Sequence, residues 1–210
     1  MSRQKQHQRS YTDLMHRRAI LLLPLTAALL ACAEAPTQRL LTGASPIRSV
    51  CIFAWGNDDP AVAAPAHEAL STTLARNGLA VAQVVTLQQP FADLKALEQA
   101  WIAAPSADPA SHALVLTRQY QQTGYVRYEA VLWDATERKL VWKGTLASAA
   151  SFGAVGHAVK PDDSNKRAER LAADVLRGLD RDGIFPLNGK APRDSRGHEI
   201  SPTLIPIQLL

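Results

Sequence analysis

The chain has 210 residues and a net charge of +4, from 23 basic and 19 acidic residues. Its first 31 residues hold five of the basic residues and one of the acidic ones, so the rest of the chain has 18 of each. This balance excludes the clustered basic surface that nucleic-acid binding needs, and two cysteines are too few for a disulfide scaffold.

The N-terminal region has the pattern of an export signal. Arg17 and Arg18 precede an apolar run over residues 19–31, which ends at Cys32. A positive segment, a short apolar segment and small residues before a cleavage site are typical of a secretory signal peptide. The run of 13 residues is shorter than the roughly 20 that cross a bilayer. Twin-arginine export is an alternative route, although the Phe and Lys usual around such a pair are missing.

The residues Leu29-Leu30-Ala31-Cys32 resemble the lipobox of bacterial lipoproteins. The resemblance implies cleavage before Cys32 and acylation of that residue, which would attach the protein firmly to a membrane. No Asp follows the cysteine directly, which favours the periplasmic side of the outer membrane in a Gram-negative cell. The alternative is an ordinary signal peptide, with Cys32 unmodified or paired with Cys51. Met15 could also open a compact signal, so the start is Met1 or Met15.

Beyond the signal peptide, the chain divides into three segments. Pro36, Gly43 and Pro46 interrupt residues 32–47, which we interpret as a flexible tether. Residues 48–186 have the periodicity of a single domain. Residues 187–210 contain three prolines and no periodic pattern, and we expect an irregular, disordered tail, with packing on the domain or binding of a partner as alternatives.

The first half of the domain alternates strands and helices. An apolar run without alternation predicts a strand covered on both faces over residues 49–55. Helical spacing of apolar residues follows over 61–77, ending at Asn77-Gly78. A valine-rich strand is predicted over 79–87, and a helix over 91–102.

The second half has the pattern of an antiparallel meander followed by a helix. Strands are predicted over residues 112–119, 125–133 and 140–146. In 125–133 the residues alternate between two faces, with Ala130 and Leu132 on one and Val131 and Trp133 on the other. The third strand is followed by a Gly-containing loop over 151–163 and a helix over 165–180, with Ser164 or Asn165 as its cap. The order β-α-β-α-β-β-β-α predicts an α/β (α+β) fold with a single mixed sheet and helices packed on it.

A family resemblance rests on four short segments of the domain. These are residues 128–134, 139–144, 168–171 and 179–186. They resemble a group of bacterial envelope lipoproteins, and the order of elements is similar to the small α/β domain of the N-terminal part of TolB, the curli-secretion lipoprotein and the lipoprotein activators of peptidoglycan synthases. The resemblance covers residues 48–186 and implies a role in binding other envelope proteins, without assigning any functional residue.

Residues suited to catalysis or metal binding are few. No His stands four residues from another His or near a Cys, so a zinc pattern is absent, and neither a metal nor a cofactor is expected. Ser151 and His157, with Asp162 and Asp163 nearby, are the only candidates for a hydrolase. Small residues between a strand and a helix explain that loop equally well. The acidic turn over residues 57–59 is expected to be solvated.

Two tryptophans are the candidate binding residues. Trp133 and Trp142 flank the predicted hairpin turn. Outward-facing indoles would form a contact site, whereas an inward-facing cross-strand pair would be sheet packing. Cys51 lies in an apolar strand and is expected to be an inert buried thiol. The sequence thus favours a non-enzymatic lipoprotein, anchored through Cys32, that binds an unidentified envelope protein. A periplasmic hydrolase and an amphiphile-binding protein are the alternatives.

Overall fold

A computed structural model describes most of the chain as two compact units. One unit is residues 34–203, and the other consists of residues 1–33 and 204–210. In the smaller unit, β1 (Cys32–Ala33) pairs antiparallel with β8 (Ile205–Pro206). The described residues are 32–33, 37–41, 47–55, 60–104, 110–122, 125–149, 161–202 and 205–206.

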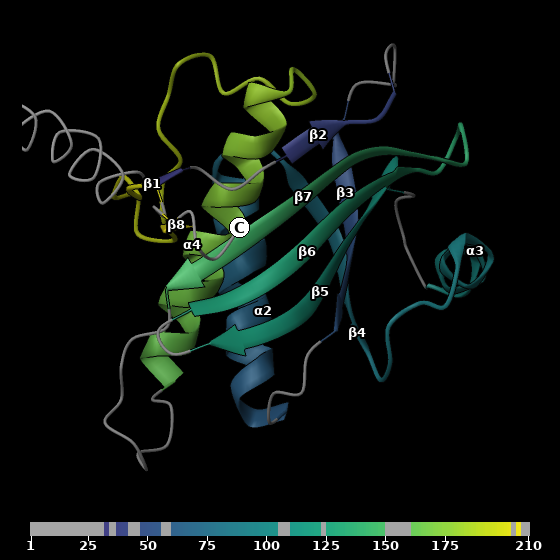
Figure 1. The fold of residues 1–210 in the computed structure, drawn as a ribbon, viewed down its shortest axis with the longest axis horizontal. Coiled ribbons are helices and arrows are strands. Elements are labelled where there is room, and N and C mark those ends of the chain that lie inside the picture. The colour runs from purple at the N-terminus through teal and green to yellow at the C-terminus, as the bar shows by residue number, and fades with distance from the viewer. Residues whose placement is uncertain are drawn as a thin grey trace, which may run out of the picture. The chain divides into compact units, whose positions relative to one another are not determined.

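The larger unit is built on one six-stranded mixed sheet (Figure 1). Its strand order is β2-β7-β6-β5-β3-β4, with β3 parallel to both β4 and β5 and the remaining pairs antiparallel. This confirms the predicted fold class and the predicted order of elements. The strands are β2 (Thr37–Arg39), β3 (Ser49–Trp55), β4 (Ala80–Leu87), β5 (His112–Gln122), β6 (Tyr125–Asp134) and β7 (Lys139–Ala149).

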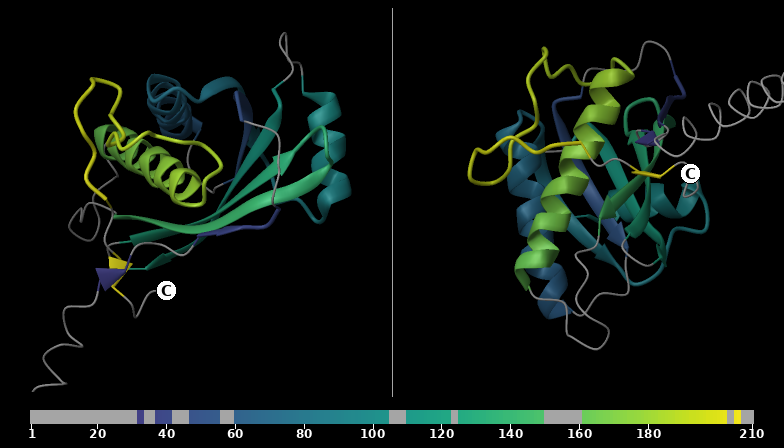
Figure 2. Two further views of the ribbon diagram at one scale, coloured as in Figure 1. Left: turned by 90° about the horizontal axis from the view of Figure 1, so that it is seen from above. Right: turned by 60° about the vertical axis from the view of Figure 1, so that its left-hand side comes forward.

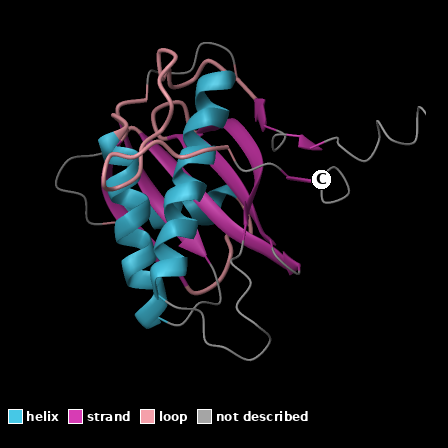
Figure 3. Ribbon diagram, turned by 90° about the vertical axis from the view of Figure 1, so that its left-hand side faces the viewer, coloured by secondary structure: helices cyan, strands magenta, loops and turns pink. Residues whose placement is uncertain are grey.

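The helices cover both faces of this sheet. α2 (Pro60–Arg76) and α4 (Pro161–Arg181) lie side by side on one face, and α3 (Leu94–Ala103) packs on the other (Figures 2 and 3). The connectivity explains this division. The α2 crossover leads from β3 to β4 on one side, whereas the α3 crossover leads back past β3 to β5 on the other side. Crossovers between parallel strands are right-handed. Because these two run across the sheet in opposite directions, their helices lie on opposite faces.

Each central strand contributes alternate residues to the two cores. In β3, Val50 and Ile52 join the core beneath α2 and α4, whereas Cys51 and Phe53 join the core beneath α3. The prediction of a strand covered on both faces is confirmed. The alternation predicted for β6 is also confirmed, since Ala130 and Leu132 lie in the first core and Val131 and Trp133 contact the second.

The segment expected to be a flexible tether contains a strand. Thr37–Arg39 pair antiparallel with residues 142–144 of β7, and the Leu40 amide donates to the Val141 carbonyl oxygen at 2.9 Å. The interpretation of the whole of 32–47 as a tether is therefore wrong for residues 37–41. Three residues are too few to give a periodic pattern, and their position depends on contacts with α4.

Two helix boundaries differ from the sequence prediction. α3 begins at Leu94 rather than near residue 91, because the Asp93 side chain accepts a 2.8 Å hydrogen bond from the Ala96 amide as an N-cap. α4 begins at Pro161, a residue favoured in the first helical turn. Ser164 therefore lies buried within the helix, and the prediction of a cap at Ser164 or Asn165 is wrong.

The first part of the tail is irregular but ordered against the helices. The Asn77 side chain, at the end of α2, exchanges hydrogen bonds of 2.8 and 2.9 Å with the carbonyl and amide of Arg193. The Ser195 amide and hydroxyl donate to Glu169 of α4. The expectation of an irregular segment holds for residues 187–202, whereas the expectation of disorder does not.

Candidate functional site

Trp142 lies where β7, β2 and α4 meet. Its side chain is fully buried, and glycines leave the space for it on two sides. A Cβ atom added at Gly144 would lie 2.8 Å from Cη2 of the indole, and one added at Gly178 would lie 2.7 Å from Cζ2. The indole Nε1 donates a 2.7 Å hydrogen bond to Oδ2 of Asp182. This predicted contact residue is therefore a core residue that joins the sheet to α4.

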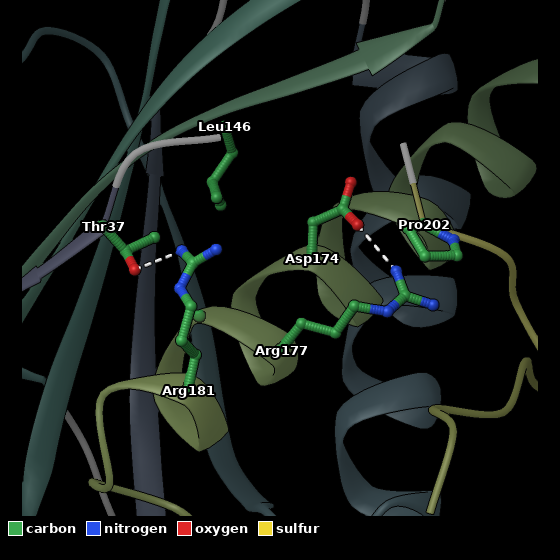
Figure 4. A pocket seen from close by; sticks show the side chains of 7 residues that line it. Thr37, Leu146, Asp174, Arg177, Arg181 and Pro202 are labelled. Atoms are coloured by element: carbon green, nitrogen blue, oxygen red, sulfur yellow. Dashed lines mark hydrogen bonds and ion pairs between the residues drawn. The ribbon is translucent and has the colours of Figure 1, made fainter. Parts of the chain in front are cut away.

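Two side chains of β2 face the end of α4. The Arg39 guanidinium donates to the carbonyl oxygens of Gly183 at 3.3 Å and of Asp182 at 3.5 Å, where the C-terminal end of a helix attracts a cation. In the other direction, Arg181 donates to the hydroxyl of Thr37 (Figure 4). We call these contacts the β2 clasp. They hold the shortest strand of the sheet in place.

A small hollow lies beside the β2 clasp. It has a volume of about 20 Å³, which is enough for one water molecule and not for a larger ligand. At its edge, the Arg177 guanidinium donates to the Asp174 carboxylate at 2.7 Å (Figure 4). It also donates to the carbonyl oxygen of Ile200. The hollow is lined by Thr37, Leu146, Asp174, Arg177, Gly178, Arg181 and Pro202.

Trp133 lies in the opposite core. Only 2% of its surface is exposed, and its ring meets that of Trp101 edge to face at 5.8 Å and 68°. A register shift in the β6–β7 pairing places Trp133 opposite Leu140, while Trp142 pairs with Leu132. The two tryptophans are consequently on different faces and are not a cross-strand pair. With both indoles buried, they do not form the outward contact site considered from the sequence.

A buried polar pair lies at the start of β5. His112 and Asp134 are both fully buried, and Nε2 of the imidazole lies 3.6 Å from Oδ2 of the carboxylate. The other ring nitrogen, Nδ1, lies 2.8 Å from the Ser111 hydroxyl, which donates to the Ser49 carbonyl. Burial lowers the pKa of His112, and the charge of Asp134 opposes that change. The pair resembles two members of a catalytic triad, but it is closed off from substrate.

The Asp134 carboxylate has a structural role in this pair. Its Oδ1 atom accepts hydrogen bonds from the amides of Thr136 at 2.8 Å and Glu137 at 3.0 Å, which closes the turn between β6 and β7. Sequence reasoning treated His112 only as the start of a strand and did not pair it with Asp134, because the two residues are 22 positions apart. Their antiparallel register brings them opposite each other.

Cys51 is a buried free thiol on the α3 side of β3. Burial raises its pKa from 9.0 to about 11, so almost no thiolate is present at neutral pH. Both the burial and the direction of the shift agree with the expected inert thiol. Cys32, the expected lipidation residue, lies in β1 of the smaller unit.

An uncharged pocket lies between the end of β4 and the start of α3, and we call it the β4-end pocket. Its volume is about 400 Å³, and none of its lining residues is ionisable. Phe91 forms part of its wall and packs edge to face on Phe53 of the core, with ring centroids 5.5 Å apart. The pocket is lined by Leu87, Gln88, Gln89, Pro90, Phe91, Ala92, Ala96 and Gln99.

Sequence reasoning did not identify the β4-end pocket. The sequence pattern predicts a strand ending at residue 87 and a helix beginning at residue 91, and it assigns no role to Gln88-Gln89-Pro90 between them. The signal available in the sequence was the pair of amide side chains directly after a parallel strand, because the carboxyl ends of parallel strands are a usual place for ligand sites.

Two further histidines are described by the structure, whereas the candidate loop residues are not. His67 lies 3.4 Å from the Thr86 hydroxyl, and His198 lies 3.3 Å from Asp194. Residues 57–59, Ser151 and His157 lie outside the described residues. Among the described ones, no group of three or more His, Cys, Asp or Glu side chains could hold a metal ion, and none of the described helices is long and apolar enough to cross a membrane.

Comparisons with known proteins give likenesses of fold at low similarity. No protein-family model matches the chain, and no curated protein matches its sequence. The PelC dodecamer from Paraburkholderia phytofirmans is 19% identical, with a TM-score of 0.40, over 69% of this chain and 95% of that one. Lipoprotein GNA1162 from Neisseria meningitidis is 14% identical, with a TM-score of 0.31, over 52% of this chain and 86% of that one. The LpoB C-terminal domain from Salmonella enterica is 14% identical, with a TM-score of 0.30, over 51% of this chain and 87% of that one. At these scores no function is transferred from them.

Proposed function

We propose that the protein is an exported lipoprotein, anchored by lipid on Cys32, whose larger unit is a non-enzymatic binding module for another component of the cell envelope. The observation that carries the proposal is the sequence from Arg17 to Cys32, in which a positive segment and a short apolar run end at a cysteine. The absence of Asp directly after that cysteine favours the periplasmic side of the outer membrane.

The surroundings of the reactive groups support the non-enzymatic part of the proposal. In the described residues, the His112–Asp134 pair is fully buried, and Cys51 is a buried thiol with a raised pKa. A general base or a nucleophile must reach its substrate within hydrogen-bond distance. The hydrolase alternative depends on Ser151 and His157, and a Ser151→Ala, His157→Ala double variant is expected to keep full function in the envelope.

The amphiphile-binding alternative has less support. Between α4 and the β2–β7 edge, the hollow of about 20 Å³ would not admit an acyl chain. Side chains from α2, α4 and the sheet fill the rest of this layer with one continuous apolar core. An uncharged surface pocket at the end of β4 is a better candidate for binding.

The decisive test is the intact mass of the protein isolated from its native membranes. We expect a mass increase equal to that of the acyl groups on Cys32, and release of a Cys32→Ala variant from the membrane. Cys51→Ala is the matched control, because it removes the other cysteine and should leave both the mass increase and the membrane attachment intact. An unmodified Cys32 in membrane-derived protein would contradict the proposal.

A further inference from the structure

In the part of the chain that the structure describes, the outer side of β4 is an open sheet edge. β4 is the last strand of the sheet, and among the described residues no strand pairs with its outer side. Charged side chains and prolines usually prevent an edge strand from pairing with another chain. The eight residues of β4 include neither. The pairing of β4 with β3 contains one register shift, because Val50 of β3 lies opposite Val81 and the next residue, Cys51, lies opposite Gln83. From there on, Gln83–Leu87 pair residue for residue with Cys51–Trp55. The regular part of the open edge is therefore Gln83–Leu87.

The opposite edge of the sheet is protected, which makes the open edge specific to β4. β2 has three residues, and Arg39 and Thr37 attach it to the end of α4. Short length and a charged side chain are both devices that prevent pairing at an edge. The same domain thus protects one edge and leaves the other one uncharged.

The β4-end pocket continues the open edge. β4 ends at Leu87, which is itself one of the residues that line the pocket. Gln88, Gln89 and Gln99 supply amide groups that both donate and accept hydrogen bonds, and Phe91 supplies an apolar wall. A chain that pairs with β4 would reach this pocket within a few residues.

We infer that the β4 edge and the β4-end pocket together bind an extended, uncharged segment of a partner protein. The segment adds to the sheet as a strand beside β4 and places one uncharged side chain in the pocket. This inference rests on the proposed binding function and names its site and the chemistry of its partner.

Two physical arguments select this occupant. The edge of a strand presents main-chain donors and acceptors at the spacing of a polypeptide, and only another extended polypeptide matches them. Neither the edge nor the pocket lining has a charge with which a charged segment could pair. Burying an unpaired charge is costly, so the segment must be uncharged where it contacts β4.

The test uses the full-length protein in its native membrane, with a photo-crosslinking residue at one position at a time. Ala82 is exposed and directly precedes the regular part of the edge, so it reports on the edge, and Gln89 reports on the pocket. The exposed residues Ala75 of α2 and Arg170 of α4 serve as controls on the helix face. We expect Ala82 and Gln89 to capture the same short, uncharged segment of one partner, and the controls to capture little of it.

A charge on the edge tests whether strand pairing is responsible. Ala82→Lys should lower the crosslinking yield at Gln89 by at least about tenfold, because a lysine on an edge opposes pairing. Ala75→Lys, a matched exposed substitution on α2, should leave the yield unchanged. The melting temperatures of both variants establish that the domain remains folded.

The captured segment, made as a synthetic peptide, tests the role of its main chain. The unmodified peptide should bind the purified protein and slow the hydrogen exchange of Gln83–Leu87 amides. A version with alternate amides N-methylated keeps every side chain but loses main-chain donors, and it should not bind.

The outcomes separate this inference from the proposed function. Capture from Ala75 or Arg170 without capture from Ala82 and Gln89 would overturn the β4 site, while the proposed binding function of the protein would still stand. Capture of a second copy of this chain through β4, or equal binding of the N-methylated peptide, would overturn the stated occupant. No capture from any position would count against the binding function itself.

Discussion

The indole nitrogen of Trp142 donates a 2.7 Å hydrogen bond to the carboxylate of Asp182, joining the middle of β7 to the residue directly after α4. The ring lies between Gly144 and Gly178, and a methyl group of Thr37 from β2 lies beside both glycines. One side chain thus fixes the distance between the sheet, its short edge strand and the last helix. The packing here should be sensitive to single atoms.

Gly178→Ala should destabilise the protein. In an ordinary helix the change from glycine to alanine is stabilising by about 1 kcal/mol. Here the new methyl group would lie 2.7 Å from the Trp142 ring and 3.0 Å from the Thr37 methyl, and we expect a loss of about 1–3 kcal/mol from overpacking. Urea unfolding measures the change. The control is the same change in a Trp142→Phe background, where the smaller ring should make Gly178→Ala less costly. A Gly178→Ala variant as stable as the parent would contradict the close packing.

Asp182→Ala should leave the buried indole N–H of Trp142 without its acceptor. The expected cost is about 1–3 kcal/mol, the penalty for an unpaired buried donor. Asp182→Asn keeps an oxygen acceptor of nearly the same shape and should retain most of the stability. Comparing the two variants by urea unfolding separates the hydrogen bond from general effects at this position. Equal stability losses in both variants would mean that the hydrogen bond contributes little.

The stability of the protein should fall at low pH because of His112. Burial lowers the pKa of this residue in the folded state. As the pH falls, the unfolded chain therefore binds a proton at His112 before the folded protein does. The contribution of His112 to the free energy of unfolding is fully present above the unfolded pKa of about 6.5. It decreases as the pH falls below that value, by at most about 1.4 kcal/mol per pH unit. A His112→Gln variant should show a weaker dependence between pH 7 and pH 5. An NMR titration that gave His112 a pKa above that of a free histidine would reverse the sign.

Cys51 should give the opposite dependence at high pH. Its folded pKa of about 11 exceeds the unfolded value of 9.0, so the contribution to stability is present below pH 9 and is lost as the pH rises through the folded pKa. At pH 8 the folded protein should react slowly with a thiol reagent, and denaturant should make the same thiol fully reactive. Rapid labelling of the folded protein would show that the thiol is accessible. Cys51→Ala should remove the high-pH slope.

The order of elements was predictable because periodicity and turn residues mark it directly. The apolar run over 49–55 indicated a strand covered on both faces, and the alternation in residues 125–133 indicated which of its side chains share a face. The strand Thr37–Arg39 could not be predicted in the same way. Its place depends on Arg181, which is 144 residues away along the chain, and no local pattern encodes such a contact.

The candidate sites were less predictable than the fold. Alternation tells which residues of a strand share a face, but not which face a neighbouring helix covers. For this reason the burial of Trp133 and Trp142 could not be decided from the sequence. Their assignment as a possible cross-strand pair was wrong because the register shift between Leu132 and Trp133 displaces the two strands by one residue. The β4-end pocket depends on the angle between a strand and a helix, which no motif specifies.

If Cys32 carries a lipid as we propose, the β2 clasp shortens the stretch of chain between that lipid and the sheet. If the sheet began at Ser49, the chain from Cys32 to the sheet could span about 60 Å at full extension. Because β2 begins at Thr37, the same stretch can span only about 18 Å. A protein anchored in this way would work close to the bilayer. β4 lies five strand spacings from β2, about 24 Å along the sheet, so a partner that pairs with β4 would not compete with the anchored edge for space at the membrane.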